Sequence, residues 1–118
     1  MPKYFNEIKK ILKELDYWEE KLCKAFKTGN KKDIEKIAKI IKELLKKLHY
    51  FINIEFGTSR NQRIDQLSMS LYYWRRMYEE ASRKGDVEGM LSALGQIRRI
   101  EKEIRRELER ENGSEMEL

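Results

Sequence analysis

The sequence contains little cysteine, histidine, proline or glycine, and each shortage excludes a class of structure or chemistry. Its one cysteine, Cys23, excludes an internal disulfide and any site built from several cysteines. With one histidine, a zinc site would have to rely on carboxylates. One proline and six glycines among 118 residues are too few for a turn-rich chain, so long helices are favoured.

Long apolar runs are also missing. No stretch approaches the roughly 20 uncharged apolar residues of a membrane-spanning helix, and residues 1–4 lack the apolar core of a secretion signal. We therefore expect a soluble, cytoplasmic protein with no membrane partner. The net charge of +5 arises from 26 basic residues interleaved with 21 acidic ones. The lysines within residues 32–47 have no aromatic stacking platform beside them, so nucleic acid is not an expected partner.

What the sequence does contain is a set of four amphipathic segments, in which apolar residues recur at spacings of three and four. Gly29-Asn30 and Gly85-Asp86 each join a helix-ending glycine to a helix-capping side chain. We predict an all-α, antiparallel, up-down-up-down four-helix bundle that forms one domain over residues 1–118. Its hairpins span about 3–56 and 60–112, with a frayed tail over 113–118. The first apolar stripe is Phe5, Ile8, Leu12, Leu15, Trp18, Leu22 and Phe26.

The two predicted hairpins resemble each other in sequence. A shift of 56 positions aligns Tyr17-Trp18 with Tyr73-Trp74, and Gly29 with Gly85. Neither hairpin can bury its stripe alone, so we expect the two to pack into a pseudo-symmetric bundle.

Two apolar positions of the first repeat become polar in the second, where Leu12 is replaced by Ser68 and Leu45 by Glu101. Glu101 lies on the core stripe of the last helix, which predicts a buried carboxylate. Counting from the turns places His49 and Ser68 at one level, with Glu101 within about one turn of them. Buried polar groups need partners, so this layer predicts a ligand pocket. The alternative is that Glu101 reaches arginines of its own helix at the surface.

Trp18 and Trp74 are the candidate walls of this pocket. The sequence has no glycine-rich phosphate loop, no Glu-x-x-His pair and no cluster of Cys and His ligands. We therefore expect a non-enzymatic protein with no catalytic residues, no cofactor and no metal site.

The run Ala25–Lys31, followed by a long helix with a histidine at position 49, resembles the second-helix entry of de novo designed four-helix bundles that bind drug-like small molecules. The resemblance implies a small-molecule ligand held in the core. His49 is the one polar core residue that it carries over by position. The leading hypothesis is a designed bundle that binds an apolar or aromatic small molecule, with His49, Ser68 and Glu101 as polar anchors.

The outer face of the third predicted helix supports a second hypothesis, from a different class of function. Methionine, tyrosine and arginine replace mainly charged residues of the first repeat there, and these residue types are enriched at protein interfaces. The alternative function is a scaffold or protein-binding module, or self-association, through this face. Its residues are Met69, Tyr72, Tyr73, Arg76 and Met77.

Overall fold

The computed structural model describes residues 4–56 and 62–117, and the side chains of 4–55 and 62–110. Within these residues the chain forms four α-helices and no strand, which confirms the predicted all-α class. The helices are α1 (Phe5–Thr28), α2 (Lys31–Phe56), α3 (Gln62–Lys84) and α4 (Val87–Glu117).

The two hairpin turns use the chemistry that the sequence predicts. Gly29 and Gly85 both have φ of 71°, in the left-handed region that glycine adopts without steric cost. The Asn30 side chain accepts a hydrogen bond from the backbone N–H three residues later (3.2 Å), and Asp86 does the same (3.0 Å). Both caps satisfy amide groups that the start of a helix leaves unpaired.

The fourth helix extends beyond the predicted boundary of the second hairpin near 112: α4 continues through Gly113 to Glu117. The expected fraying of this tail stays a prediction. The preceding segment is rich in glutamate and arginine, which are strong helix formers, and one interior glycine costs a helix only about 1 kcal/mol. The breaker cluster Gly57-Thr58-Ser59 lies outside the described residues.

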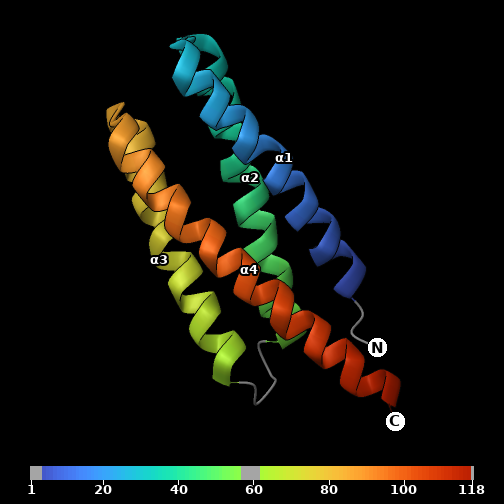
Figure 1. Ribbon diagram of the computed structural model, residues 1–118. Helices are drawn as coiled ribbons and strands as arrows, with labels where there is room; N and C mark the ends of the chain where they lie inside the picture. The colour runs from blue at the N-terminus through green and yellow to red at the C-terminus, as the bar shows by residue number, and fades with distance from the viewer. Residues whose placement is uncertain (1–3, 57–61, 118) are drawn as a thin grey trace.

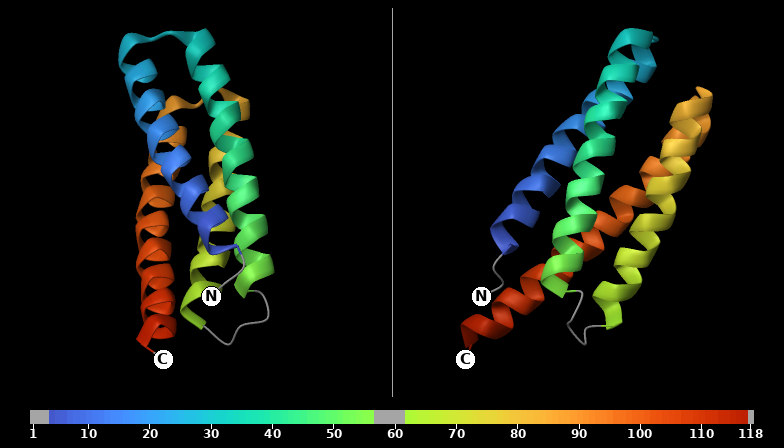
Figure 2. Two further views of the ribbon diagram at one scale, coloured as in Figure 1. Left: turned by 90° about the vertical axis from the view of Figure 1, so that its right-hand side faces the viewer. Right: turned by 180° about the vertical axis from the view of Figure 1, so that it is seen from behind.

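The helices form an elongated bundle with principal extents of 51 × 22 × 18 Å. Each hairpin packs its two helices closely, α2 packs against α3, and α1 makes the sparsest contact with α4. Figures 1 and 2 show the two hairpins crossing at an angle, with the α1–α2 turn well separated from the α3–α4 turn. This arrangement confirms the predicted bundle and leaves the α1–α4 junction loosely packed.

The apolar stripes of all four helices meet in one core, but the first stripe needs a correction. Trp18 is only half-buried, whereas Glu19 has no exposed surface at all. The steps from Leu15 to Glu19 and on to Leu22 are four and three residues, so Glu19 continues the stripe on the face that points inward. Within the described residues, no helix is both long and apolar enough to cross a membrane.

Equivalent contacts in the two hairpins support the repeat. Tyr17 lies edge-on to Trp18 and Tyr73 edge-on to Trp74, with ring centroids 5.1 Å apart in both pairs. Asp16 pairs with Arg105 across the α1–α4 junction. The residues 56 positions away from these two are Tyr72 and His49, whose rings lie 5.5 Å apart across the α2–α3 junction. The α1–α4 and α2–α3 junctions are therefore pseudo-equivalent.

Candidate functional site: a buried carboxyl cluster between α1 and α4

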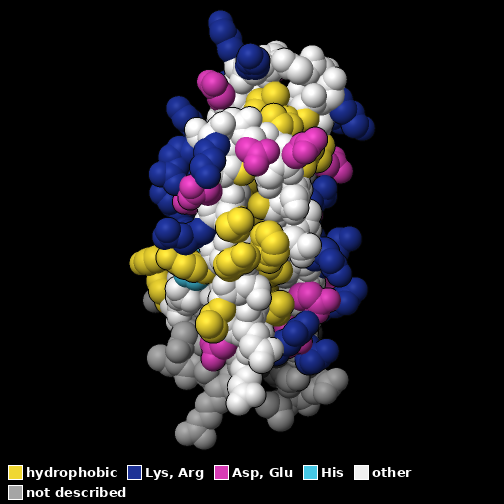
Figure 3. All heavy atoms as spheres, turned by 90° about the vertical axis from the view of Figure 1, so that its left-hand side faces the viewer, with side chains coloured by type: hydrophobic (Ala, Val, Ile, Leu, Met, Phe, Trp, Pro, Cys, Tyr) yellow, Lys and Arg dark blue, Asp and Glu magenta, His cyan; other side chains and the backbone are white. Residues whose placement is uncertain are grey.

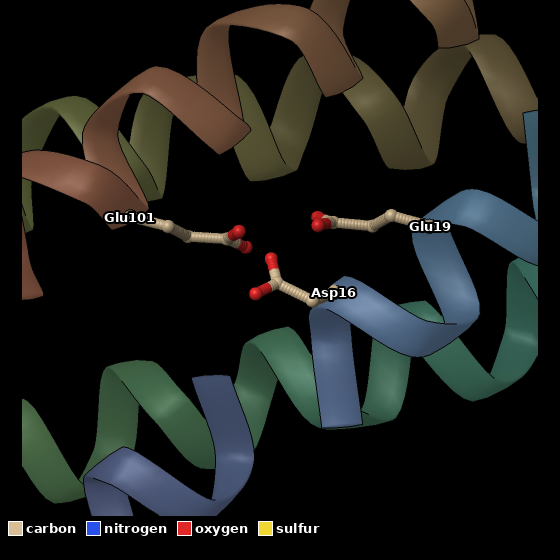
Figure 4. Close-up of side chains that lie close together, drawn as sticks. All are labelled: Asp16, Glu19 and Glu101. Carbon is tan, nitrogen blue, oxygen red and sulfur yellow. The ribbon is translucent and has the colours of Figure 1, made fainter. Parts of the chain in front are cut away.

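Three carboxyl groups from two helices converge inside the bundle. Asp16 and Glu19 come from α1, and Glu101 comes from α4 (Figure 4). One oxygen from each lies within 4.8 Å of the others. Glu19 and Glu101 have 0% and 1% of their surface exposed, and Asp16 is half-buried at the edge. The predicted burial of Glu101 is thus confirmed.

The antiparallel course of the two helices explains why these side chains meet. Side chains on a helix lean toward its N-terminus. Because α1 and α4 run in opposite directions, Glu19 and Glu101 lean toward each other along the bundle axis, as Figure 4 shows. Each glutamate occupies a core position of its own helix, so neither carboxyl group can reach bulk water.

Two arginines of α4 partly balance this negative charge. Arg105 donates to the Asp16 carboxylate at 2.6 Å and to the Leu12 carbonyl oxygen at 2.9 Å. Arg98 Nε lies 3.5 Å from Glu19 Oε1, a distance that allows an ion pair. The prediction that Glu101 forms a surface salt bridge with an arginine of its own helix is not realised in the described residues, since these arginines reach across to α1.

Burial shifts the proton affinity of both glutamates. Loss of hydration raises the pKa of Glu19 to about 7, against the favourable effect of the hydrogen bond with Glu101 and of Arg98. The pKa of Glu101 is raised well above its ordinary value, first by burial and then by the nearby Glu19 charge. The pair therefore binds a proton more tightly than ordinary glutamates do. We assign this proton to Glu101, because the charges of Glu19 and Asp16 add to the effect of burial there, whereas a hydrogen bond and Arg98 oppose it at Glu19.

A shared proton lets Glu101 donate a hydrogen bond to Glu19. If both groups are ionised, both oxygens of Glu19 and Oε1 of Glu101 lack a hydrogen-bond partner among the described residues. Buried acceptors without partners are costly, by about 1–3 kcal/mol each. The cluster is therefore satisfied only when a proton or another donor occupies the space between the two glutamates.

A hollow of about 350 Å³ opens between α1 and α4 beside this cluster. Leu12 and Leu108 form its apolar walls, and the Asp16–Arg105 pair forms its inner end. Asp16 links the hollow to the glutamates, because its carboxylate oxygen is within 4.8 Å of theirs. The remaining lining residues are Lys9, Lys13 and Glu109, all exposed.

The structure brings two of the three predicted polar anchors together at the α2–α3 junction. Ser68 donates to the Asn53 side-chain oxygen at 3.2 Å, and the Asn53 amide nitrogen lies 3.0 Å from His49 Nε2. Burial, and then the nearby Arg75 charge, lower the pKa of His49. Within the described side chains, neither His49 nor Ser68 shares a hydrogen bond or ion pair with Glu101, whose carboxyl group faces α1 instead.

Neither tryptophan lines the hollow beside the carboxyl cluster. Both are half-buried and pack against the core. Trp74 lines a hollow of about 240 Å³ near the α3–α4 turn, together with Ala81 and Ala93. The first-repeat equivalent of Ala93 is the larger Ile37, so the smaller side chain leaves room at this place.

The outer face of α3 carries the exposed apolar side chains that the sequence predicts. Met69 is 74% exposed and Tyr73 is 55% exposed, and Tyr72 and Met77 are also exposed. Figure 3 shows hydrophobic side chains gathered at mid-height on the side of the molecule where α3 lies. Arg76 donates to the Tyr72 hydroxyl oxygen at 3.3 Å, so part of this face is held by internal contacts.

The sequence reasoning missed Asp16, Glu19, Arg98 and Arg105 as site residues. Glu19 could have been found by the same criterion that identified Glu101, because it lies on the apolar stripe of its helix. The repeat offers a second signal, since position 75, the equivalent of Glu19, is an arginine. The other three are surface-type residues whose role depends on the neighbouring helix.

The spacing of the carboxylate oxygens would also suit a divalent cation with oxygen ligands. Such a cation takes about six or more oxygen ligands, however, and the cluster offers only three carboxyl groups, so we assign no metal ligand here. Comparison of the chain with protein-family models, with curated proteins and with solved structures finds no match in any of the three.

Proposed function

We propose that the chain is a non-enzymatic helical bundle that binds an apolar or aromatic small molecule, with Glu101 as its polar anchor. The proposal keeps the class that the resemblance to designed drug-binding bundles implied, and it moves the binding site to the α1–α4 junction. His49, Ser68, Trp18 and Trp74, the other predicted pocket residues, do not line the hollow at this junction.

One observation carries this proposal: the fully buried Glu19–Glu101 pair lies beside a hollow with leucine walls. Natural ligand sites combine a mostly apolar lining with a few convergent polar groups, and they have volumes of about 300–1,000 Å³. The hollow of about 350 Å³ falls at the lower end of this range. His49 pairs with an amide rather than with a carboxylate in the described residues, which favours binding over catalysis.

Thermal unfolding of the parent and of Glu101→Leu, alone and with a panel of small aromatic compounds, tests the proposal. A compound that binds the folded state raises the unfolding midpoint by mass action. We expect Glu101→Leu to lose this shift while stabilising the free protein by about 1–3 kcal/mol, since hydrocarbon replaces a buried carboxyl group. Leu45, the repeat equivalent of Glu101, is fully buried, so a leucine fits this type of position. A compound that stabilises both proteins equally would remove Glu101 from the site.

A second candidate function is protein binding or self-association through the outer face of α3. The exposure of Met69 and Tyr73 favours it, because apolar groups gathered on a surface mark many interaction sites. This function does not depend on the carboxyl cluster, and the two can be tested separately.

A further inference from the structure

We propose that the ligand of the α1–α4 site carries a primary ammonium group, held among Asp16, Glu19 and Glu101, on an apolar body that fills the hollow between Leu12 and Leu108. This inference rests on the proposed function and specifies the chemistry of its ligand.

The acceptor geometry matches an ammonium group. A primary ammonium has three N–H donors, each of which makes a hydrogen bond of about 2.9 Å. Three oxygens arranged tetrahedrally around such a nitrogen are about 4.7 Å apart. The cluster offers one oxygen from each of three carboxyl groups, and no two of these oxygens are more than 4.8 Å apart. Because Glu19 and Glu101 share a hydrogen bond, an ammonium would replace that bond and move the two carboxyl groups slightly apart. Glu19 and Glu101 would gain the donors that their buried oxygens lack.

The charge balance also favours a cation. Three carboxyl groups face two arginines, because Arg98 pairs with Glu19 and Arg105 with Asp16. Glu101 forms no ion pair among the described side chains, and Arg105, which pairs with Asp16, acts on it only from a distance. The cluster is neutral while Glu101 keeps its proton, so an ammonium would displace that proton, balance the charge of the ionised Glu101 and supply hydrogen bonds in its place. The leucine walls of the hollow then favour an organic body over a bare ion.

Lys9 and Lys13 at the mouth of the hollow do not offset this preference. Both are exposed, and charges on exposed lysines are screened by water and salt. The glutamates are almost completely buried, so their interaction with a bound cation is screened far less.

The pseudo-equivalent junction between α2 and α3 shows what the bundle does without this site. Leu45 replaces Glu101 there, and Arg75 replaces Glu19. The equivalent of the Asp16–Arg105 pair is the contact between the Tyr72 and His49 rings. Neither of these two positions holds an acid, so the junction is an internal control at which the ammonium should not bind.

The experiment is an NMR titration at pH 7 with cyclohexylmethylamine and its neutral analogue cyclohexylmethanol, following backbone amide shifts. We expect the amine to shift resonances of the α1–α4 junction and to bind at least about tenfold more tightly than the alcohol. Equal affinity of the two compounds at this junction would overturn the ammonium while leaving the proposed function standing. Failure of both compounds to bind there would contradict this inference, and the aromatic panel then decides the proposed function separately.

Two conservative variants sharpen the result. Glu101→Gln keeps the size of the side chain and should abolish the preference for the amine while the alcohol still binds, which separates loss of charge from loss of fold. Glu107→Gln is the matched control, because Glu107 is also a buried glutamate of α4 but pairs with Arg110 outside the cluster. An amine preference that survives Glu101→Gln, or disappears in Glu107→Gln, would refute the assignment.

Arg105 provides a third variant with an effect in the opposite direction. Its guanidinium is paired with the Asp16 carboxylate at the inner end of the hollow, and it would compete with the ammonium for this carboxylate. Arg105→Met should therefore increase affinity for the amine several-fold, with little effect on the alcohol. A decrease in amine affinity, in a variant whose amide spectrum remains folded, would contradict the proposed geometry.

Discussion

At the scale of single residues, the repeat shows how one substitution creates a site. Leu45 and Glu101 occupy equivalent core positions, and both are buried. The leucine adds to the core, whereas the glutamate requires a donor or a proton. Glu19 on the facing helix intensifies this requirement, because two ionised carboxylates cannot lie side by side in a water-excluded space without repulsion.

The titration of this pair predicts an unusual pH dependence of stability. Raised pKa values mean that the folded state binds protons more tightly than the unfolded chain. The contribution of Glu19 to the free energy of unfolding is therefore fully present below about pH 4.5, which is its ordinary pKa. It is lost as the pH rises through about 7, the pKa of Glu19 in the folded protein. The slope approaches about 1.4 kcal/mol per pH unit for each proton taken up on folding. The pKa of Glu101 is raised too, so Glu101 contributes a loss of the same sign.

Chemical denaturation of the parent and of Glu101→Gln between pH 4 and pH 9 measures this effect. The groups that face the pair are Asp16 on α1, Arg98 and Arg105 on α4, and Tyr78 on α3. These groups are present in both proteins, so their own titration largely cancels in the difference between the free energies of unfolding of the parent and of Glu101→Gln. We expect the variant to gain stability relative to the parent as pH rises, and a difference that stays constant with pH would contradict the shared proton.

At the scale of elements, the two turns determine where the helices end and which helices become neighbours. Gly29 and Gly85 have the same φ, and a methyl group added at either would meet no atom within 4 Å. The cost of alanine at these positions is therefore purely conformational.

Gly29→Ala and Gly85→Ala should each lower the free energy of unfolding by about 1–2 kcal/mol, the cost of a left-handed conformation for a residue with a side chain. Gly95→Ala is the matched control, since Gly95 lies inside α4 with equally open space around it. That change should stabilise the protein by about 1 kcal/mol because alanine favours helix. Urea denaturation measures the free energy of unfolding of all three variants, provided that its dependence on urea concentration keeps the slope of the parent. A change of the same sign in the turn variants and in Gly95→Ala would contradict this account.

At the scale of the whole molecule, the question is whether the chain acts alone. Its Cα radius of gyration is 15.0 Å. A second copy bound through the outer face of α3 would increase the radius in solution and make it depend on concentration.

Replacing Tyr73 and Met77 with lysine tests the interaction face. Both side chains are exposed, so the double variant should retain the helical circular dichroism spectrum and the unfolding midpoint of the parent. If the parent associates through this face, small-angle scattering across a concentration series should show association that the variant has lost. Association that persists unchanged in the variant would exclude the face.

Much of the architecture could be predicted from the sequence. Spacings of three and four identified the four helices, the glycines with their capping neighbours located the turns, and the stripe of α4 predicted that Glu101 is buried. These features depend on interactions between residues close together in the chain, which explains why sequence patterns reveal them. α4 extends past the predicted hairpin boundary, because helix propensity outweighs a single glycine.

By itself, then, the sequence determined the class, the turns, the repeat and the burial of one carboxyl group, all of which follow from local periodicity. Only the tertiary structure decided which groups surround that carboxyl. Arg105 and Asp16 are 89 residues apart in the chain, and their contact depends on the pairing and stagger of α1 and α4. Glu101 faces Glu19 rather than His49 and Ser68 because its position on α4 lies at the α1–α4 junction, whereas His49 and Ser68 meet at the α2–α3 junction.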